Sequence, residues 1–386
     1  MSPRVNNRPQ WISGLEYVSA SLVIAVLFFL LFEGAASFVM VAKNAFRPTS
    51  PLAERRHTKY DPQLGWVNIP NVYLRNMYGP GIYLHTNSRG FRSDTETSTS
   101  IPPGRVRLIC SGDSFALGYG VSNDRTWCQD LTSLDGRLET VNMGQGGYGL
   151  DQAYLWYARD GLPLDYNVHL FSFIGSDLRR MASNTFEGYP KPTLGIQNGH
   201  LVTQNVPVQQ IGSWGRLTQR LLVFRELQSI QLAQHFLFRH PLQSDGVISD
   251  GTLEVADAVF DRLAELNRAK GAQLIIAFLP TEGEYRAGMP DYIMRLKKDV
   301  TKKGIAWVDL VDDFRNLPPE QAKRLFIAQA DVPQYKSAAG HYTNEGNAFV
   351  AQLLYRHITA FPSVAAELKR LSRPRNVAAE TLASNR

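Results

Sequence analysis

Apolar and polar positions alternate in blocks along most of the chain, and this pattern predicts the fold class. Short apolar runs predict strands, and longer stretches with a helical period between them predict helices. The expected strands are Val106–Cys110, Val141–Met143, Val168–Ile174, Leu274–Leu279 and Ala306–Leu310, and the expected helices are Thr126–Leu134, Leu150–Asp160, Leu253–Lys270, Tyr285–Lys303 and Glu345–Thr359. Apolar strands that alternate with helices predict an α/β fold, in which helices cover both faces of a parallel sheet.

The N-terminal pattern is different, because Glu33 is the only charged residue between Val18 and Ala42. As a helix this segment would span roughly 37 Å at about 1.5 Å per residue, which is enough to cross a bilayer even when the helix is tilted. The basic Arg4 and Arg8, the uninterrupted run Val18–Phe32 and the Gly-Ala-Ala after it also fit a cleaved signal peptide. The apolar run resumes beyond those small residues, so we expect an uncleaved anchor, with a signal peptide as the alternative.

Composition shifts along the chain predict its organisation. The segments are a basic N-terminus (1–17), a transmembrane helix or signal-anchor (18–42), an irregular or short-stranded lead-in (43–104), an α/β domain (105–362) with an insertion at about 178–251, and a polar tail (363–386). Within the insertion, Asn198-Gly199 predicts a type I′ hairpin turn, and Trp214–Phe238 has a helical pattern.

The overall composition excludes several classes of protein. With 44% hydrophobic residues, 20% charged residues and two cysteines, the chain is not disordered, collagen-like or a disulfide scaffold. The net charge of +6 is spread over 386 residues, so we expect no nucleic-acid partner. Cys110 lies in an apolar strand, which favours free thiols for it and Cys128 over a disulfide.

Charge also bears on the orientation in the membrane. More Lys and Arg residues follow the apolar segment than precede it, which by simple counting favours a cytoplasmic body. That rule weakens when a long domain follows, because such domains are translocated largely regardless of charge. We therefore expect a single-pass protein of the cytoplasmic membrane whose body lies on the periplasmic or extracellular side.

Candidate chemistry lies where the expected strands end. Ser114 follows an apolar strand and Gly112-Asp113, where a helix N-terminus suits either a nucleophile or an ordinary helix cap. After the next strand, Gly144-x-Gly146-x-x-Gly149 matches the dinucleotide fingerprint but lacks the acidic residue about 20 positions further on. Glycines there would equally expose a backbone N–H to a reacting oxygen. His341 lies in a loop just before the last expected helix.

These segments, together with Phe171–Met181, resemble in their order the SGNH/GDSL hydrolase family over roughly residues 105–360. The resemblance implies a three-layer α/β/α, flavodoxin-like fold. It further implies Ser114 as nucleophile and His341 as general base, with the N–H groups of Ser114 and Gly147 and the side chain at Ser176 as the oxyanion hole.

The resemblance extends to supporting residues and to the lead-in. It gives Asp113 and Asp177 supporting positions beside the site. Tyr60-Asp61-Pro62, Gly65-Trp66 and Asn87–Arg92 are similar to motifs of a membrane-anchored bacterial branch found in cell-envelope and polysaccharide contexts. We expect Arg179 and Arg180, just after the third motif, to be solvated charges.

Two positions depart from the family pattern. Ser176 stands where the family has an Asn that donates to the oxyanion, and a hydroxyl is a shorter donor that rotates more freely. Ala338 and Ala339 stand where an Asp normally precedes the histidine, and the nearest upstream carboxylate is Asp331. The simplest interpretation is a Ser–His dyad whose imidazole is held by a backbone carbonyl.

The resemblance therefore implies a membrane-anchored serine esterase or O-acyltransferase. Its expected substrates are acyl esters, above all acetyl esters, of cell-envelope or extracellular polysaccharide, and it needs no cofactor or metal. The alternative is a non-catalytic domain of the same fold that binds a polysaccharide or an envelope assembly partner. A dinucleotide oxidoreductase is a third interpretation, which would leave Ser114 and His341 unexplained.

Overall fold

The computed structural model describes residues 10–46, 56–187, 189–210, 248–332 and 335–372. The chain forms two compact units, one of residues 1–50 and 211–246 and the other of residues 51–210 and 247–386. The helical stretch expected at Trp214–Phe238 and the last residues of the expected tail lie outside the described residues.

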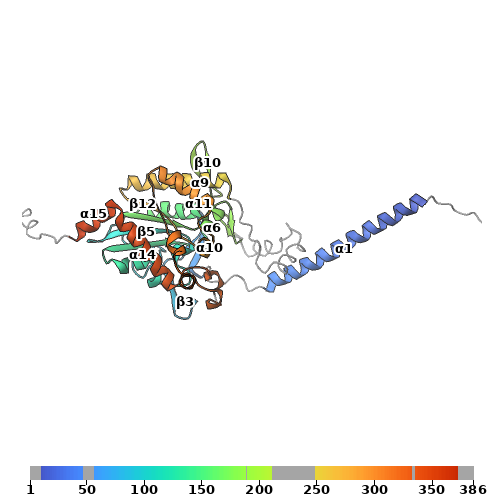
Figure 1. Ribbon diagram of the computed structural model, residues 1–386, viewed down its shortest axis with the longest axis horizontal. Helices are drawn as coiled ribbons and strands as arrows, with labels where there is room; N and C mark the ends of the chain where they lie inside the picture. The colour runs from blue at the N-terminus through green and yellow to red at the C-terminus, as the bar shows by residue number, and fades with distance from the viewer. Residues whose placement is uncertain (1–9, 47–55, 188, 211–247, 333–334, 373–386) are drawn as a thin grey trace, which may run out of the picture. The chain divides into compact units, whose positions relative to one another are not determined.

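The described part of the first unit is one long helix, α1 (Gln10–Phe46), shown in blue in Figure 1. Within it, Tyr17–Val39 is 23 residues long with a mean hydropathy of 2.5, long and apolar enough to cross a membrane. An N-terminal signal sequence satisfies the same criterion of length and composition. The expected apolar helix is therefore present, as a candidate membrane span or signal sequence.

The second unit is organised around a five-stranded parallel sheet. Its strands are β5 (Val106–Gly112), β6 (Leu138–Gly144), β7 (Val168–Phe173), β12 (Gln273–Phe278) and β13 (Ala306–Asp309). They lie in the order β13-β12-β7-β5-β6, and every neighbouring pair is parallel. This is the flavodoxin-like order, in which the chain reverses its direction of winding after β6. Ligands of such sheets bind at the carboxyl ends of the strands at that switch point, here between β5 and β7.

Helices cover both faces of the sheet, so the predicted three-layer α/β/α fold is confirmed (Figure 1). Successive residues of a strand point to opposite faces, and in β12 Ile276 packs into one core while Ile275 packs into the other. One core is covered by α5 (Leu150–Trp156), α9 (Asp250–Ala269) and α11 (Asp291–Lys302), and the other by α4 (Trp127–Leu134), α14 (Asn344–Ala360) and α15 (Pro362–Leu371).

Shorter elements complete the unit. The helices are α3 (Ser114–Leu117), α6 (Gly175–Met181), α10 (Glu282–Ala287), α12 (Val311–Arg315) and α13 (Pro319–Arg324). The remaining strands form four antiparallel hairpins: β1 (Thr58–Asp61) with β2 (Gly65–Asn68), β3 (Tyr73–Gly79) with β4 (Ile82–His85), β8 (Thr185–Phe186) with β9 (Tyr189–Pro190), and β10 (Thr193–Gln197) with β11 (His200–Gln204).

The hairpin predicted in the insertion is confirmed. Gln197 pairs with His200 across a two-residue turn. Asn198 and Gly199 have φ angles of 50° and 76°, as a type I′ turn requires. The two cysteines, Cys110 and Cys128, are free and buried.

The structure differs from the predicted elements at two helices. The helix expected over Tyr285–Lys303 is two helices, because Gly288 adopts a φ of 85° and Pro290 precedes α11. The segment expected to be a polar tail begins with α15. Val364 and Leu368 of this helix are buried in the core that α4 and α14 also cover.

Candidate active site

Ser114 is the first residue of α3, and Asp113 alone separates it from the end of β5. The helix cap is Asp113, whose side chain accepts a hydrogen bond from the Phe115 N–H at 2.9 Å. The hydroxyl of Ser114 is therefore not needed as the cap, the ordinary structural role that its position allowed. The turn before it requires glycine, since Gly112 has a φ of 156° and a Cβ there would lie 2.5 Å from the Ser172 carbonyl oxygen.

His341 reaches this serine from the other end of the domain sequence. Its Nε2 lies 2.7 Å from Ser114 Oγ, a hydrogen bond between residues 227 positions apart. The imidazole stacks on Phe115 with centroids 4.5 Å apart and packs against Tyr119 at 5.2 Å. The structure thus brings together the two residues that the motifs predicted as nucleophile and base.

The other imidazole nitrogen has no carboxylate partner. Nδ1 of His341 is buried, and no described residue makes a well-aligned hydrogen bond with it. Asp331, the nearest upstream carboxylate, is exposed in the 3₁₀ turn Gln329–Asp331 and makes no hydrogen bond or ion pair with His341. Hydrogen bonding from the backbone of Ala338 and Ala339 raises the pKa of the imidazole, and these are the residues at which the family has its acid. The described residues therefore form a dyad without a carboxylate, and a backbone carbonyl that holds the imidazole tautomer stays a prediction.

The electrostatic environment keeps His341 neutral. Burial lowers the pKa of His341 to about 4, and the positive charge of Arg180 also lowers it. The Asp113 carboxylate acts in the opposite direction and raises this pKa. A neutral imidazole with Nε2 against a serine hydroxyl is the protonation state that a general base needs.

The backbone amides predicted as oxyanion donors are unpaired. Neither the N–H of Ser114 nor that of Gly147 donates to another described residue. The loops that carry them are adjacent, because Gly112 pairs with Gly144 between β5 and β6 and the Gln145 N–H donates to the Gly112 carbonyl at 3.2 Å. Gly147 has a φ of 77°, and a Cβ on it would overlap the ring of Phe186. Only glycine fits this position without strain.

The third motif lies at the end of β7, the strand next to β5. Ser176 is partly exposed in α6, and its hydroxyl makes no hydrogen bond with a described residue. Asp177 is buried and accepts from the Ile174 N–H at 3.0 Å, which caps α6. Burial and the negative charge of Asp113 raise the pKa of Asp177.

The expectation that Arg180 is a solvated charge is wrong. Its side chain is only 19% exposed and forms ion pairs with Asp113 at 3.0 Å and Asp177 at 2.6 Å. The neighbouring Arg179 is partly exposed and has no ion pair among the described residues. Arg180 could not be distinguished from Arg179 in the sequence, because its partners lie in separate motifs.

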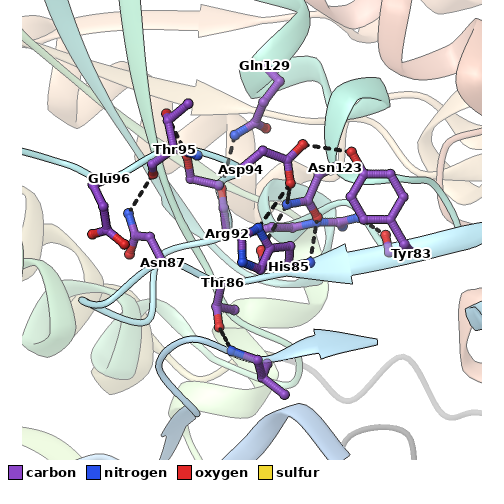
Figure 2. A network of polar contacts seen from close by, with 12 residues as sticks. Tyr83, His85, Thr86, Asn87, Arg92, Asp94, Thr95, Glu96, Asn123 and Gln129 are labelled. Carbon is purple, nitrogen blue, oxygen red and sulfur yellow. Dashed lines mark hydrogen bonds and ion pairs between the residues drawn. The ribbon is translucent and has the colours of Figure 1, made fainter. Parts of the chain in front are cut away.

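Arg92, from the lead-in, holds the turn that follows α3. Figure 2 shows this side chain beside Asn123. This fully buried side chain donates to the Leu117, Gly118 and Val121 carbonyls and to Asn123 Oδ1, at distances between 2.5 and 2.8 Å. Burial lowers its pKa. The lead-in motif that ends at Arg92 is therefore part of the framework of the site.

The β1–β2 hairpin holds the loop of the second motif. Trp66 Nε1 donates to the Gly146 carbonyl at 3.0 Å, and Gln145 Nε2 donates to Asn68 Oδ1 at 2.9 Å. The Tyr148 hydroxyl donates to the Trp66 carbonyl at 2.5 Å. These contacts flank Gly147 on both sides and fix the direction of its N–H.

Replacing Trp66 with Phe tests whether the β1–β2 hairpin holds the Gly147 loop in place. Loss of the indole N–H leaves the Gly146 carbonyl without this partner, so we expect a loss of about 1–2 kcal/mol in the free energy of unfolding. Because Gly146 adjoins Gly147, kcat for ester hydrolysis should also fall. Trp156→Phe is the matched control, since it removes a 2.9 Å hydrogen bond to Asp160 within helix α5 and its following turn. Equal effects of the two variants on kcat would contradict the view that Trp66 holds the Gly147 loop.

The comparisons with known proteins concern solved structures. No family model and no curated protein matches the chain. The chain is similar to a member of the lipolytic protein G-D-S-L family from Veillonella parvula, with a TM-score of 0.35 and 13% identity over 66% of this chain and all of that one. It is also similar to an acetyl xylan esterase, with a TM-score of 0.37 and 12% identity over 66% of this chain and all of that one. A third similar structure is a two-domain esterase active on acetylated mannans, with a TM-score of 0.36 and 8% identity over 71% of this chain and 51% of that one. The G-D-S-L family is the one that the sequence motifs resemble.

Proposed function

We propose that the protein is a membrane-anchored serine esterase or O-acyltransferase that works through a Ser114–His341 dyad. The observation that carries this proposal is the 2.7 Å contact between Ser114 Oγ and His341 Nε2, on adjacent loops with two backbone N–H groups, of Ser114 and Gly147, that donate to no other described residue. A nucleophile, a base and oxyanion donors at one place are what acyl transfer requires. The N-terminal apolar helix supports the membrane anchor.

The mechanism follows from the atoms present. His341 Nε2 takes the proton as Ser114 Oγ attacks the ester carbonyl carbon, and the carbonyl oxygen becomes an oxyanion that accepts from the Ser114 and Gly147 N–H groups. The imidazolium then protonates the leaving alkoxide as the bond from the acyl carbon to the leaving oxygen breaks. Water or a sugar hydroxyl, deprotonated by His341, attacks the acyl-enzyme and releases Ser114.

The proposed substrate is an acetylated or otherwise acylated polysaccharide of the cell envelope or the extracellular space. The lead-in motifs that resemble an envelope branch support it. So do three partly exposed aromatic side chains beside the second motif, since Trp66 lies 6.1 Å from Phe186 and 6.5 Å from Tyr189 between ring centroids. Aromatic rings offer rigid, amphipathic contact area for a ligand that is partly apolar and partly polar.

An aryl acetate assay on the full-length protein in detergent tests this proposal. An esterase releases both acetate and the phenol, whereas an acyltransferase releases the phenol and transfers acetyl to an added polysaccharide acceptor. The Ser114→Ala variant is the control for both products. If the folded wild type does not turn over the aryl acetate, the proposed enzymatic function is contradicted.

Two observations favour a second candidate, a non-catalytic polysaccharide-binding or assembly domain. His341 Nδ1 has no carboxylate partner among the described residues, and Ser176 replaces the usual Asn donor. This candidate predicts binding of an acetylated polysaccharide with equal affinity by the wild type and Ser114→Ala, and no ester cleavage by either.

The pH dependence of hydrolysis should show the environment of His341. The base works only when neutral, and its pKa is lowered to about 4, so kcat/KM should stay constant from neutral pH down to about pH 5 and fall below that. An unperturbed histidine would lose activity near its usual pKa of about 6.5. The measurement is kcat/KM for an aryl acetate between pH 3 and 8.

A folding control is needed for that profile. The unfolded chain binds a proton at His341 below about pH 6.5, whereas the folded chain does so only near the lowered pKa, so stability falls as the pH drops between those values. Intrinsic fluorescence at each pH separates unfolding from titration. If kcat/KM instead falls near pH 6.5 while the protein is still folded, the claim that burial lowers the pKa of His341 is contradicted.

A further inference from the structure

Arg180 connects three chain segments around the nucleophile. Its Nη1 group donates to Asp113 Oδ2 at 3.0 Å, to Asp177 Oδ1 at 2.6 Å and to the Tyr148 carbonyl at 3.2 Å. These acceptors follow β5, β7 and β6, three neighbouring strands of the sheet. The guanidinium also lies over Phe186, 5.5 Å from the ring centroid. One side chain therefore links the carboxyl ends of the strands that carry the first three motifs.

The two carboxylates need this partner. The side chains of Asp113 and Asp177 are each 2% exposed, and burial together with the charge of Asp113 raises the pKa of Asp177. Two uncompensated negative charges would repel the oxyanion that forms beside Ser114. The charge of Arg180 offsets them and lowers the pKa of Asp177.

The same contact affects the Ser114 hydroxyl. Ser114 Oγ lies 2.7 Å from His341 Nε2 and 3.4 Å from Asp113 Oδ2, and its single hydrogen can be donated to only one of them. Arg180 makes a charge-assisted hydrogen bond to that same Oδ2. The guanidinium does not block this oxygen, which has a second lone pair, but its positive charge makes the oxygen a weaker acceptor for the serine. Together with the shorter contact to His341, this favours donation of the serine hydrogen to His341.

We propose that Arg180 is a positioning residue of the dyad: it orients the Ser114 hydroxyl toward His341 through Asp113 and holds the Gly147 loop through the Tyr148 carbonyl. The catalytic consequence rests on the proposed function, whereas the electrostatic consequence does not. Asp113 and Arg180 are the charged groups that act on His341, with opposite signs. Removing Arg180 leaves the negative one and must therefore raise the histidine pKa.

The test compares Arg180→Met with Arg179→Met in full-length protein in detergent. The two variants lose the same charge at adjacent positions, but only Arg180 contacts the site. The first readout is the titration of the His341 imidazole by NMR of protein with ¹³C-labelled histidine, assigned with His341→Gln. We expect a higher midpoint in Arg180→Met and the wild-type midpoint in Arg179→Met. Equal midpoints in both variants would overturn the proposal.

The second readout is turnover of an aryl acetate. Misplacement of a reacting group by a fraction of a bond length can cost a factor of up to about 100, so kcat should fall by about 10- to 100-fold in Arg180→Met with little change in KM. Arg180→Lys keeps the charge and three donors, and should keep the wild-type midpoint and recover part of kcat. It also serves if Arg180→Met does not fold. A lysine variant as impaired in both readouts as the methionine variant would overturn the proposal.

These readouts separate the inference from the proposed function. If the wild type does not hydrolyse esters, the proposed function fails, and the histidine titration still decides whether Arg180 controls the dyad. If the wild type is active but the titration is the same in the wild type and both arginine variants, the inference alone fails.

Discussion

Ser114→Ala and His341→Gln should each reduce kcat for ester hydrolysis by about 10⁴- to 10⁶-fold, the range found when either member of a serine–histidine pair is removed. The physical reason is that Oγ is the attacking atom and Nε2, 2.7 Å away, is the acceptor of its proton. The double variant should be no slower than either single variant, because the two groups act as a unit. Single-turnover and steady-state rates with an aryl acetate measure this.

Matched controls exclude a general loss of fold. His357 is an exposed histidine on α14, and Ser363 is an exposed serine at the start of α15. His357→Gln and Ser363→Ala should retain the wild-type rate. If the effects of Ser114→Ala and His341→Gln multiply in the double variant, the two residues act independently and the dyad is wrong.

Gly147→Ala should lower kcat by about 10²- to 10³-fold, which is the usual cost of losing one oxyanion donor. A Cβ at this position overlaps the Phe186 ring, and the φ of 77° is unfavourable for any residue with a Cβ. The loop must therefore move, and the N–H of residue 147 moves with it. KM should change little, because the oxyanion forms only in the transition state.

The variant Phe186→Ala separates the two causes. It removes the ring that the new Cβ would overlap but does not change the backbone conformation, so adding it to Gly147→Ala should recover only part of the lost rate. Gly199→Ala is a control at a glycine with a similar φ of 76° and open space around it, in the insertion hairpin. It should leave kcat unchanged. Wild-type kcat in Gly147→Ala would contradict the role of this amide.

Much of the fold could be predicted because its signals are local. The five sheet strands are apolar runs of four to seven residues, and such runs between helical periods predict a parallel sheet wherever they occur. The turn at Asn198-Gly199 could be predicted because both positions need a positive φ, which those residue types tolerate. Ser114 and His341 could be predicted because each lies within a short, recognisable motif beside the end of an element.

The contacts of Trp66 and Arg180 at the site could not be predicted, because each of these residues has a partner that is distant in the sequence. Trp66 holds a carbonyl 80 positions away, and Arg180 pairs with a carboxylate 67 positions away. An arginine at the border of a polar insertion is usually solvated, and no periodicity distinguishes a buried one. The break at Gly288 was missed for a related reason, since a glycine inside a helical pattern is often tolerated.

The acid that would complete a triad is missing, which shows what a motif can and cannot establish. The sequence shows alanines where an acid would stand, and it predicted a backbone carbonyl in its place. In the structure, hydrogen bonding from the backbone of Ala338 and Ala339 raises the pKa of His341, and the imidazole also packs on the rings of Phe115 and Tyr119. The ring packing is an interaction that the local sequence does not reveal.

The most direct test of the dyad is covalent labelling of the full-length protein with a fluorophosphonate, read by intact mass and peptide mapping. Ser114 Oγ attacks phosphorus, fluoride leaves, and His341 takes the hydroxyl proton. One phosphonyl group on Ser114 is expected in the wild type, none in Ser114→Ala, and much slower labelling in His341→Gln. A folded wild type that stays unlabelled, or a Ser114→Ala variant labelled as fast as the wild type, would contradict the account.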